Sequence, residues 1–275
     1  DVPMKVSYDV VIKSGDQEVD MEYGLDTLSG TAEVTCILAE AILRKKIIKR
    51  RTHVNPARAV LKQSFKSSYG QNFDLIVNEP ELAAELKKMT RSVFSEVMGY
   101  FISESLYLET KELSPKAAGI IEELEEIEDE LIDRIRQPLV RMHRINLQKN
   151  FDVELNYKKP AGKQRIAKLD TMTATNLTQS KIMPGQVNIN AVITRFNART
   201  GNGRLVIEGE DDTVAFGFYM PLKAIPAAQK RLVSLNLHNN NGRQDNYTYL
   251  KLTVSKVVVK SGDVVKYLIR MVETV

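Results

Sequence analysis

The stretch that decides the fold is VNINAVITRFNARTGNGRLVIEGEDDTVAFGFYM, residues 187–220. Its β-branched and aromatic residues predict three strands, separated by turns rich in glycine, asparagine and aspartate. A helix and two more strands follow, so that the expected strands are 187–196, 204–208, 213–220, 247–259 and 264–272, with the helix over 222–232. This element order matches an OB-fold barrel, and other small barrels with an inserted helix would look alike. We therefore expect a small, OB-like β-barrel in the C-terminal part.

The residues before the barrel predict an α+β layer. Val6–Lys13 and a short run over 19–23 flank the turn Ser14-Gly15-Asp16, a hairpin pattern, and 60–66 with 73–77 form a second one. Between them, apolar positions from Leu28 to Leu43 recur every three or four residues, which indicates a helix. Two long amphipathic helices, 82–101 and 120–139, are expected to pair as an antiparallel helical hairpin that would suit a homodimer.

The domain boundary is expected where apolar periodicity fades. Residues 158–183 are rich in Lys, Arg, Thr and Ala, which is typical of a linker. This divides the chain into an N-terminal α+β domain over 4–157, the linker, and the barrel domain over 184–275.

The composition of the chain narrows the cellular location and the kinds of partner that we expect. The chain has 275 residues, a net charge of +4 and one cysteine, Cys36, which cannot form an internal disulfide. No apolar run approaches the roughly 20 residues of a membrane-spanning helix, and no leader pattern opens the sequence. We expect a cytoplasmic protein without a membrane partner, and the mildly basic charge permits a polyanionic one.

Signatures of catalysis are scarce. The three histidines, His53, His143 and His238, have no close partner in sequence, and the common hydrolase, zinc and phosphate-loop motifs are absent. A metal-dependent nuclease could combine Asp74 with Glu85-Leu86-Lys87, yet the last three fall in a predicted helix, where Glu85 and Lys87 face different sides. We expect no enzyme, no cofactor and no metal.

Two basic regions favour nucleic acid as the partner. The first follows a predicted helix and consists of Arg44, Lys45, Lys46, Lys49, Arg50 and Arg51, with Arg58, Lys62 and Lys66 as a further extension. Closely spaced cations can neutralise several phosphates, and cations also favour the negative end of a helix dipole without any ligand. Both interpretations stay open at this point.

The second region lies in the barrel. Arg195, Arg199 and Arg204 surround the turn Gly201-Asn202-Gly203. Strand alternation puts Tyr247, Tyr249 and Lys251 on the face opposite the core residues Leu250 and Leu252. Exposed rings beside cations are what single-strand binders use, whereas cross-strand packing is another common use of tyrosine.

An acidic helix leaves a second class of function open. Eight acids crowd one predicted helix: Glu122, Glu123, Glu125, Glu126, Glu128, Asp129, Glu130 and Asp133. They are typical of a solvated helix face and would also suit docking of a basic protein. A protein-interaction adaptor, inhibitor or complex subunit is therefore the alternative to nucleic-acid binding.

The opening strand, the turn Ser14-Gly15-Asp16 and the helix start Leu25-Asp26-Thr27-Leu28-Ser29-Gly30 resemble a family of uncharacterised bacterial and prophage proteins. That family opens with a strand and a G-G-D-like turn, continues into a helix with an L-x-x-L-x-G-like start, and closes with a small β-barrel. Ser14 stands here in place of the first glycine of the turn. The resemblance implies a role in phage defence or counter-defence and carries over no catalytic residues.

Overall fold

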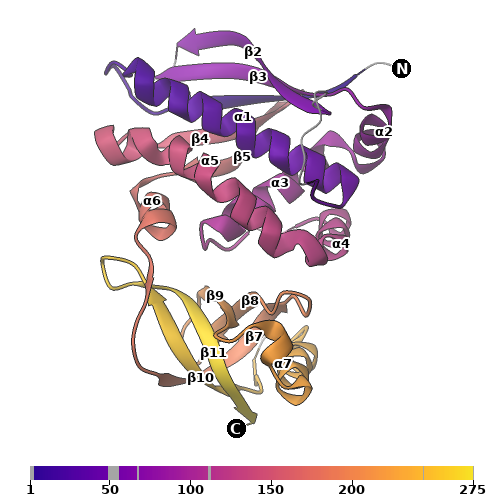
Figure 1. Cartoon of the computed structure of the whole chain (residues 1–275), viewed down its shortest axis with the longest axis vertical. Helices are drawn as coiled ribbons and strands as arrows, with labels where there is room; N and C mark the ends of the chain where they lie inside the picture. Colours follow the sequence, from indigo (N-terminus) through magenta and orange to yellow (C-terminus); the bar gives the residue numbers. More distant parts are fainter. Residues whose placement is uncertain (1–2, 49–55, 67, 111–112, 244, 275) are drawn as a thin grey trace. The chain divides into compact units, whose positions relative to one another are not determined.

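The computed structural model describes residues 3–48, 56–66, 68–110, 113–243 and 245–274. The chain divides into two compact units, the first formed by 1–106 and 110–178, the second by 107–109 and 179–275 (Figure 1). Residues 158–183, predicted as a linker, instead contain a strand and a helix of the first unit, Gly162–Leu169 and Thr171–Thr178. Lysines of this segment lie on the edge strand and its threonines lie in the short helix, so the weak apolar periodicity reflects exposure rather than absence of structure.

The first unit is built on an antiparallel sheet of five strands in the order β2-β3-β1-β4-β5. The strands are β1 (Met4–Ile12), β2 (Ala57–Lys66), β3 (Tyr69–Val77), β4 (Val153–Lys159) and β5 (Gly162–Leu169). The predicted β2–β3 hairpin is confirmed. The predicted hairpin about Ser14-Gly15-Asp16 is wrong, because β1 pairs with β3 and β4 and the chain turns directly into a helix at Met21. The long-range partners bury both faces of β1, which a local hairpin would not.

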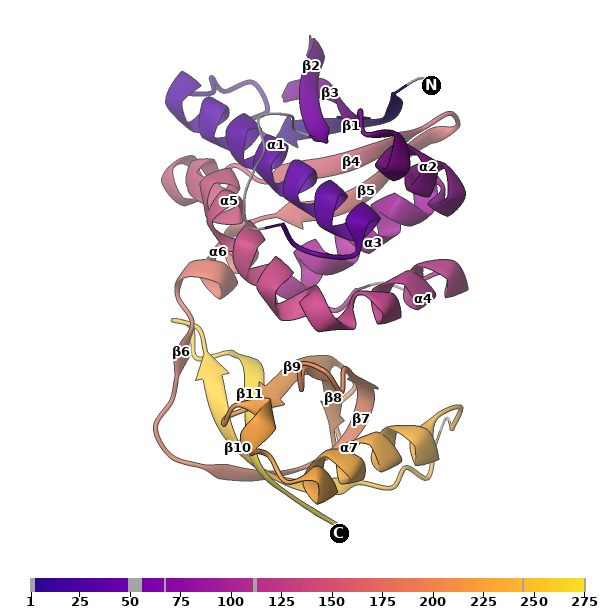
Figure 2. The same cartoon turned by 45° about the vertical axis from the view of Figure 1, so that its right-hand side comes forward.

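Helices cover one face of this sheet. They are α1 (Met21–Arg44), α2 (Pro80–Met89), α3 (Arg91–Ser105), α4 (Pro115–Glu123), α5 (Glu128–Lys149) and α6 (Thr171–Thr178), with a short 3₁₀ turn over Glu125–Ile127. α1 and α5 lie side by side, as Figures 1 and 2 both show. Gly30 permits this approach, since a Cβ there would lie 2.6 Å from the carbonyl oxygen of Pro138 on α5.

The two long helices expected over 82–101 and 120–139 are each divided in the structure. Thr90 adopts a φ of +81° between α2 and α3, and its side chain accepts a hydrogen bond from the amide of Val93 to start α3. The 3₁₀ turn separates α4 from α5 without a positive φ or a side-chain cap. α5 packs against α1 more extensively than against α3, so the main helix pair joins segments that the sequence pattern did not connect.

The second unit contains a closed barrel of five strands. These are β7 (Val187–Phe196), β8 (Gly203–Ile207), β9 (Thr213–Phe218), β10 (Leu250–Val258) and β11 (Val264–Thr274). β7, β8 and β9 pair in sequence, β9 pairs in parallel with β11, and β10 closes the ring between β11 and β7. The predicted α+β class and small barrel are therefore confirmed.

A helix inserted between the third and fourth barrel strands completes this unit (Figure 2). It is α7 (Ala227–Asn240), preceded by a 3₁₀ turn at Leu222–Ala224, and the two-residue strand β6 (Lys181–Ile182) adds to the end of β10. The barrel core joins Leu205, Phe216, Leu252 and Ile269 with Val233 of α7. Within the described ranges, no helix combines the length and the hydropathy that crossing a bilayer would require.

Candidate nucleic-acid interface on the barrel

Strand register brings three cations into one line across the outside of the barrel. Arg195 of β7 is the direct partner of Arg204 of β8, Arg204 is the partner of Ala215 of β9, and Ala215 is the partner of Lys266 of β11. Directly paired residues point to the same side of a sheet, and the neighbours Leu205, Phe216 and Tyr267 point into the core. We call Arg195, Arg204 and Lys266 the basic row.

The side chains of the basic row are held by polar contacts along the surface. Arg204 donates from Nε to the hydroxyl of Thr213 at 2.8 Å and from Nη2 to its carbonyl at 3.2 Å. Lys266 donates to the side-chain carbonyl of Asn202 at 3.3 Å. Gly217 makes room for this pair, because a Cβ there would lie 2.8 Å from Asn202 Oδ1 and 3.1 Å from Lys266 Cε. The small residues of β9 thus give the side chains of the basic row room to lie across this strand.

The β7–β8 turn carries a fourth cation next to this row. Asn197 shapes the turn, since its side chain accepts hydrogen bonds from the amides of Arg199 and Thr200, and Gly201 takes a φ of +82°. Arg199 is exposed at the tip and is the most accessible of the four cations, whereas Arg204 is the most buried. The predicted residues Arg195, Arg199 and Arg204 therefore come together around one turn. Sequence reasoning missed Lys266, which joins them only through the parallel pairing of β9 with β11.

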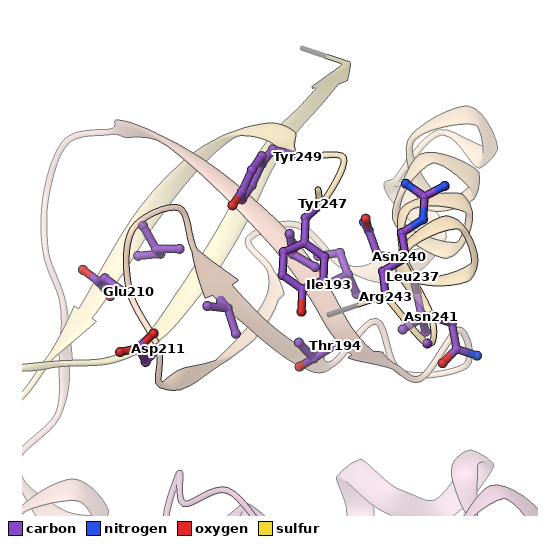
Figure 3. Close-up of a pocket in the computed structure, with 14 residues that line it drawn as sticks. Ile193, Thr194, Glu210, Asp211, Leu237, Asn240, Asn241, Arg243, Tyr247 and Tyr249 are labelled. Carbon is purple, nitrogen blue, oxygen red and sulfur yellow. The ribbon is translucent and has the colours of Figure 1, made fainter. Parts of the chain in front are cut away.

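Figure 3 shows a second feature of the barrel, a pocket lined by residues of its strands, of α7 and of the segment that follows α7. It has a volume of about 440 Å³, and Val192 and Val206, which are direct cross-strand partners, contribute to its lining. Val206 lies two residues after Arg204 on β8, so its Cα is about 7 Å from that of Arg204 along the strand. The pocket therefore adjoins the basic row.

Aromatic and polar side chains form the walls of this pocket. Tyr247 and Tyr249 line it from the segment between α7 and β10, and Tyr247 is 38% exposed. Glu210 and Asp211 lie on the β8–β9 turn at one side, with Arg243 at the end of α7 on the other (Figure 3). The pocket thus has hydrogen-bond acceptors on one side and a cation on the other.

Two buried asparagines of α7 fix the segment that carries the tyrosines. Asn236 accepts a hydrogen bond from the amide of Ile193 and donates to the carbonyl of Thr248 at 2.7 Å. Asn240 donates to the same carbonyl at 2.8 Å and accepts from the amide of Thr248 at 2.8 Å. Because Thr248 stands between Tyr247 and Tyr249, the backbone that presents both rings is tied to the helix.

The third residue predicted beside the tyrosines is placed elsewhere. β10 begins at Leu250, so Tyr247 and Tyr249 precede the strand, whereas Lys251 lies within it. Lys251 is exposed and lies 4.0 Å from the carboxylate of Glu273 on β11. Leu250 and Leu252 point into the core as expected, which places Lys251 on the outside and away from the residues that line the pocket.

The other predicted basic region is described in part. Arg44 ends α1 and forms a close ion pair with Glu79, and this hydrogen bond raises the pKa of the guanidinium. Lys45 adopts a left-handed cap with φ of +62° and contacts Glu123 at 2.7 Å, which raises the pKa of its amine. Lys46 is exposed. The remaining members, Lys49, Arg50 and Arg51, lie outside the described residues.

The residues weighed for catalysis are dispersed. Asp74 on β3 accepts a hydrogen bond from Ser7, while Glu85 on α2 faces Lys45 at 3.9 Å. Among the residues that the structure describes, no group of three or more His, Cys, Asp or Glu side chains is arranged to hold a metal ion. Asp74 and Glu85 thus have different polar partners.

Comparisons with known proteins identify no relative. No family model, no curated protein sequence and no solved structure matches the chain.

Proposed function

We propose that the protein binds single-stranded nucleic acid on the outside of the barrel and performs no chemistry of its own. The observation that carries this proposal is the basic row beside an aromatic-walled pocket on one continuous surface. Cations along a groove neutralise phosphates, and tyrosine rings provide stacking surfaces for bases. Both functions are needed to hold a flexible strand.

The barrel topology supports the same proposal. Strands in the order first, second, third, fifth, fourth, with a helix after the third, follow the pattern of an OB-fold. In OB-folds the second and third strands and the first turn form the usual ligand surface. Here these are β8, β9 and the turn that carries Arg199, so we propose that the barrel is an OB-fold used in the ordinary way.

A binding titration tests the proposal. Fluorescence anisotropy with single- and double-stranded DNA and RNA of one sequence, each at 50 and 200 mM salt, should show binding of single strands that weakens steeply with salt. Each contacted phosphate contributes about 0.7 to the slope of log affinity against log salt for single strands. Failure of every single strand to bind at 50 mM salt would end the proposal.

A protein partner is the second candidate. Acidic side chains of α4, of the 3₁₀ turn and of the start of α5 are exposed, namely Glu122, Glu123, Glu126, Asp129, Glu130 and Asp133. This surface would favour a basic protein, and a homodimer or a role in phage defence or counter-defence would be compatible with it. Capture of a defined partner that persists at 500 mM salt, without nucleic acid, would favour this alternative.

A further inference from the structure

The pocket between the β8–β9 turn and the end of α7 has features beyond general strand binding. Its volume of about 440 Å³ lies in the range of small-molecule sites. Its walls combine two tyrosines, apolar strand residues and two exposed carboxylates, Glu210 and Asp211 (Figure 3). We propose that this pocket receives one unpaired base of the strand and prefers bases that carry an amino group. The inference rests on the proposed function and assigns it a base preference.

The shape and lining of the pocket suit a flat, largely apolar ring. Tyr247 and Tyr249 offer π faces, and Val192 and Val206 supply apolar contact from adjacent strands. Stacking of a base on an aromatic side chain stabilises the complex and accepts any base, because every base has a π face. The rings therefore provide affinity and leave the choice of base to the polar groups.

The carboxylates supply the choice, because the guanidinium of Arg243 on the opposite side already donates to the carbonyl of Asn246. Ionised Glu210 and Asp211 only accept hydrogen bonds. Cytosine, adenine and guanine carry exocyclic amino groups with two N–H donors, whereas thymine and uracil offer only a ring N3–H that stands between two carbonyl oxygens. A carbonyl facing a carboxylate is repelled and leaves both groups without a partner. Amino-bearing bases are therefore favoured.

The charges also orient the bound nucleotide. Phosphates are repelled by Glu210 and Asp211 and attracted by the basic row, whose member Arg204 lies two residues before the pocket residue Val206 on β8. A nucleotide consequently places its base in the pocket with its phosphate toward Arg204. Because a paired base cannot enter, the site excludes an intact duplex.

The pocket is formed before any ligand arrives. The backbone of Thr248 makes three hydrogen bonds to Asn236 and Asn240, at 2.7, 2.8 and 2.8 Å. Both asparagine side chains are buried, so the tyrosines on either side of Thr248 are held in place. Binding therefore loses little conformational entropy through the ordering of this segment.

The test compares twelve-residue deoxycytidine and deoxythymidine oligonucleotides by anisotropy at 50 mM salt. The wild type should bind the cytosine strand at least 5-fold more tightly than the thymine strand. In E210Q/D211N this preference should fall below 2-fold. The matched control E208Q/D212N removes the same charge from exposed positions of the same turn that do not line the pocket, and it should keep the preference.

A second variant separates stacking from charge. Tyr247→Ala should weaken both oligonucleotides about 5- to 10-fold and leave the salt slope unchanged. Circular dichroism of each variant establishes that the barrel is folded. If wild type binds both strands equally with a normal salt slope, the base pocket is refuted and the proposed function stands. Absence of binding by any strand refutes both, and deoxycytidine monophosphate binding as tightly as the oligonucleotide would refute the assignment to a strand.

Discussion

Two groups of cations differ in how they are assembled. Arg44, Lys45 and Lys46 are consecutive in the sequence, yet Arg44 and Lys45 turn to carboxylates of neighbouring segments at the end of α1. Arg195, Arg204 and Lys266 are spread over 72 positions, and strand register places them in one line. A run of consecutive cations in the sequence thus does not predict a binding surface, because the tertiary structure determines which groups each cation contacts.

The largest expected effect follows from this difference. R195Q/R199Q/K266Q should lower the affinity for a single strand about 30- to 100-fold at 50 mM salt, since each cation that meets a phosphate contributes about 1 kcal/mol. The salt slope should fall by about 2. R44Q/K45Q/K46Q removes the same charge and should change affinity less than 3-fold. Equal losses in the two triple variants would show that net charge alone governs binding.

A smaller effect is expected from the support of the pocket. Asn236→Ala leaves the buried amide of Ile193 and one bond to Thr248 without a partner, which should destabilise the barrel by about 2 kcal/mol. Urea unfolding measures this loss. Asn241→Ala at the exposed end of α7 is the control and should cost less than about 0.5 kcal/mol. Similar costs at both positions would argue against the asparagine support.

How much of the barrel could be read from the sequence depended on the range of the interactions. Alternation and turn residues are local, so five strands, their succession along the chain and the cations around Gly201 were predictable, whereas the order of the strands in the sheet was not. Lys266 was not found, because its place beside Arg204 requires the parallel pairing of β9 with β11. The pocket likewise joins α7 to β8, and no periodicity reports that contact.

The first unit was less predictable for the same reason. Its central strand β1 pairs with β3, 57–73 residues away, and with β4, 141–149 residues away, whereas the sequence pattern favoured a local hairpin. The break at Thr90 has no glycine or proline to announce it, and it is stabilised by how α2 and α3 pack. Local rules predict where helices and strands occur, and tertiary contacts decide which of them meet.

A pH effect should separate the two units. His143 of α5 is fully buried; its Nδ1 donates to the carbonyl of Leu139 at 2.7 Å, and its Nε2 lies 2.9 Å from the hydroxyl of Thr173. Burial lowers the pKa of this imidazole below its ordinary value of 6.5. The unfolded chain therefore binds the proton first as the pH falls, and stability present above pH 6.5 is lost below it.

The free energy of unfolding should fall by at most about 1.4 kcal/mol per pH unit, and His143→Gln should remove this pH dependence. Thermal unfolding between pH 5 and 8 measures the slope. His238→Gln, at an exposed position of α7, is the control and should keep it. If stability still changes with pH in His143→Gln, other groups cause the change. A pH dependence seen only when the barrel unfolds would contradict the placement of His143 in the first unit.

The smallest effect concerns the end of α1. Arg44 and Glu79 form a partly buried pair, with 19% and 32% of their side chains exposed, so a double-mutant cycle with Arg44→Ala and Glu79→Ala should give a coupling of about 0.5–1 kcal/mol. The same cycle for Lys251 and Glu273, an exposed pair at 4.0 Å, should give less than about 0.3 kcal/mol. If Arg44 bound the nucleic acid instead, the coupling between Arg44 and Glu79 would vanish, and Arg44→Ala would weaken the binding of the nucleic-acid strand. A measurable coupling with unchanged binding would make the consecutive cations a structural feature and leave recognition to the basic row.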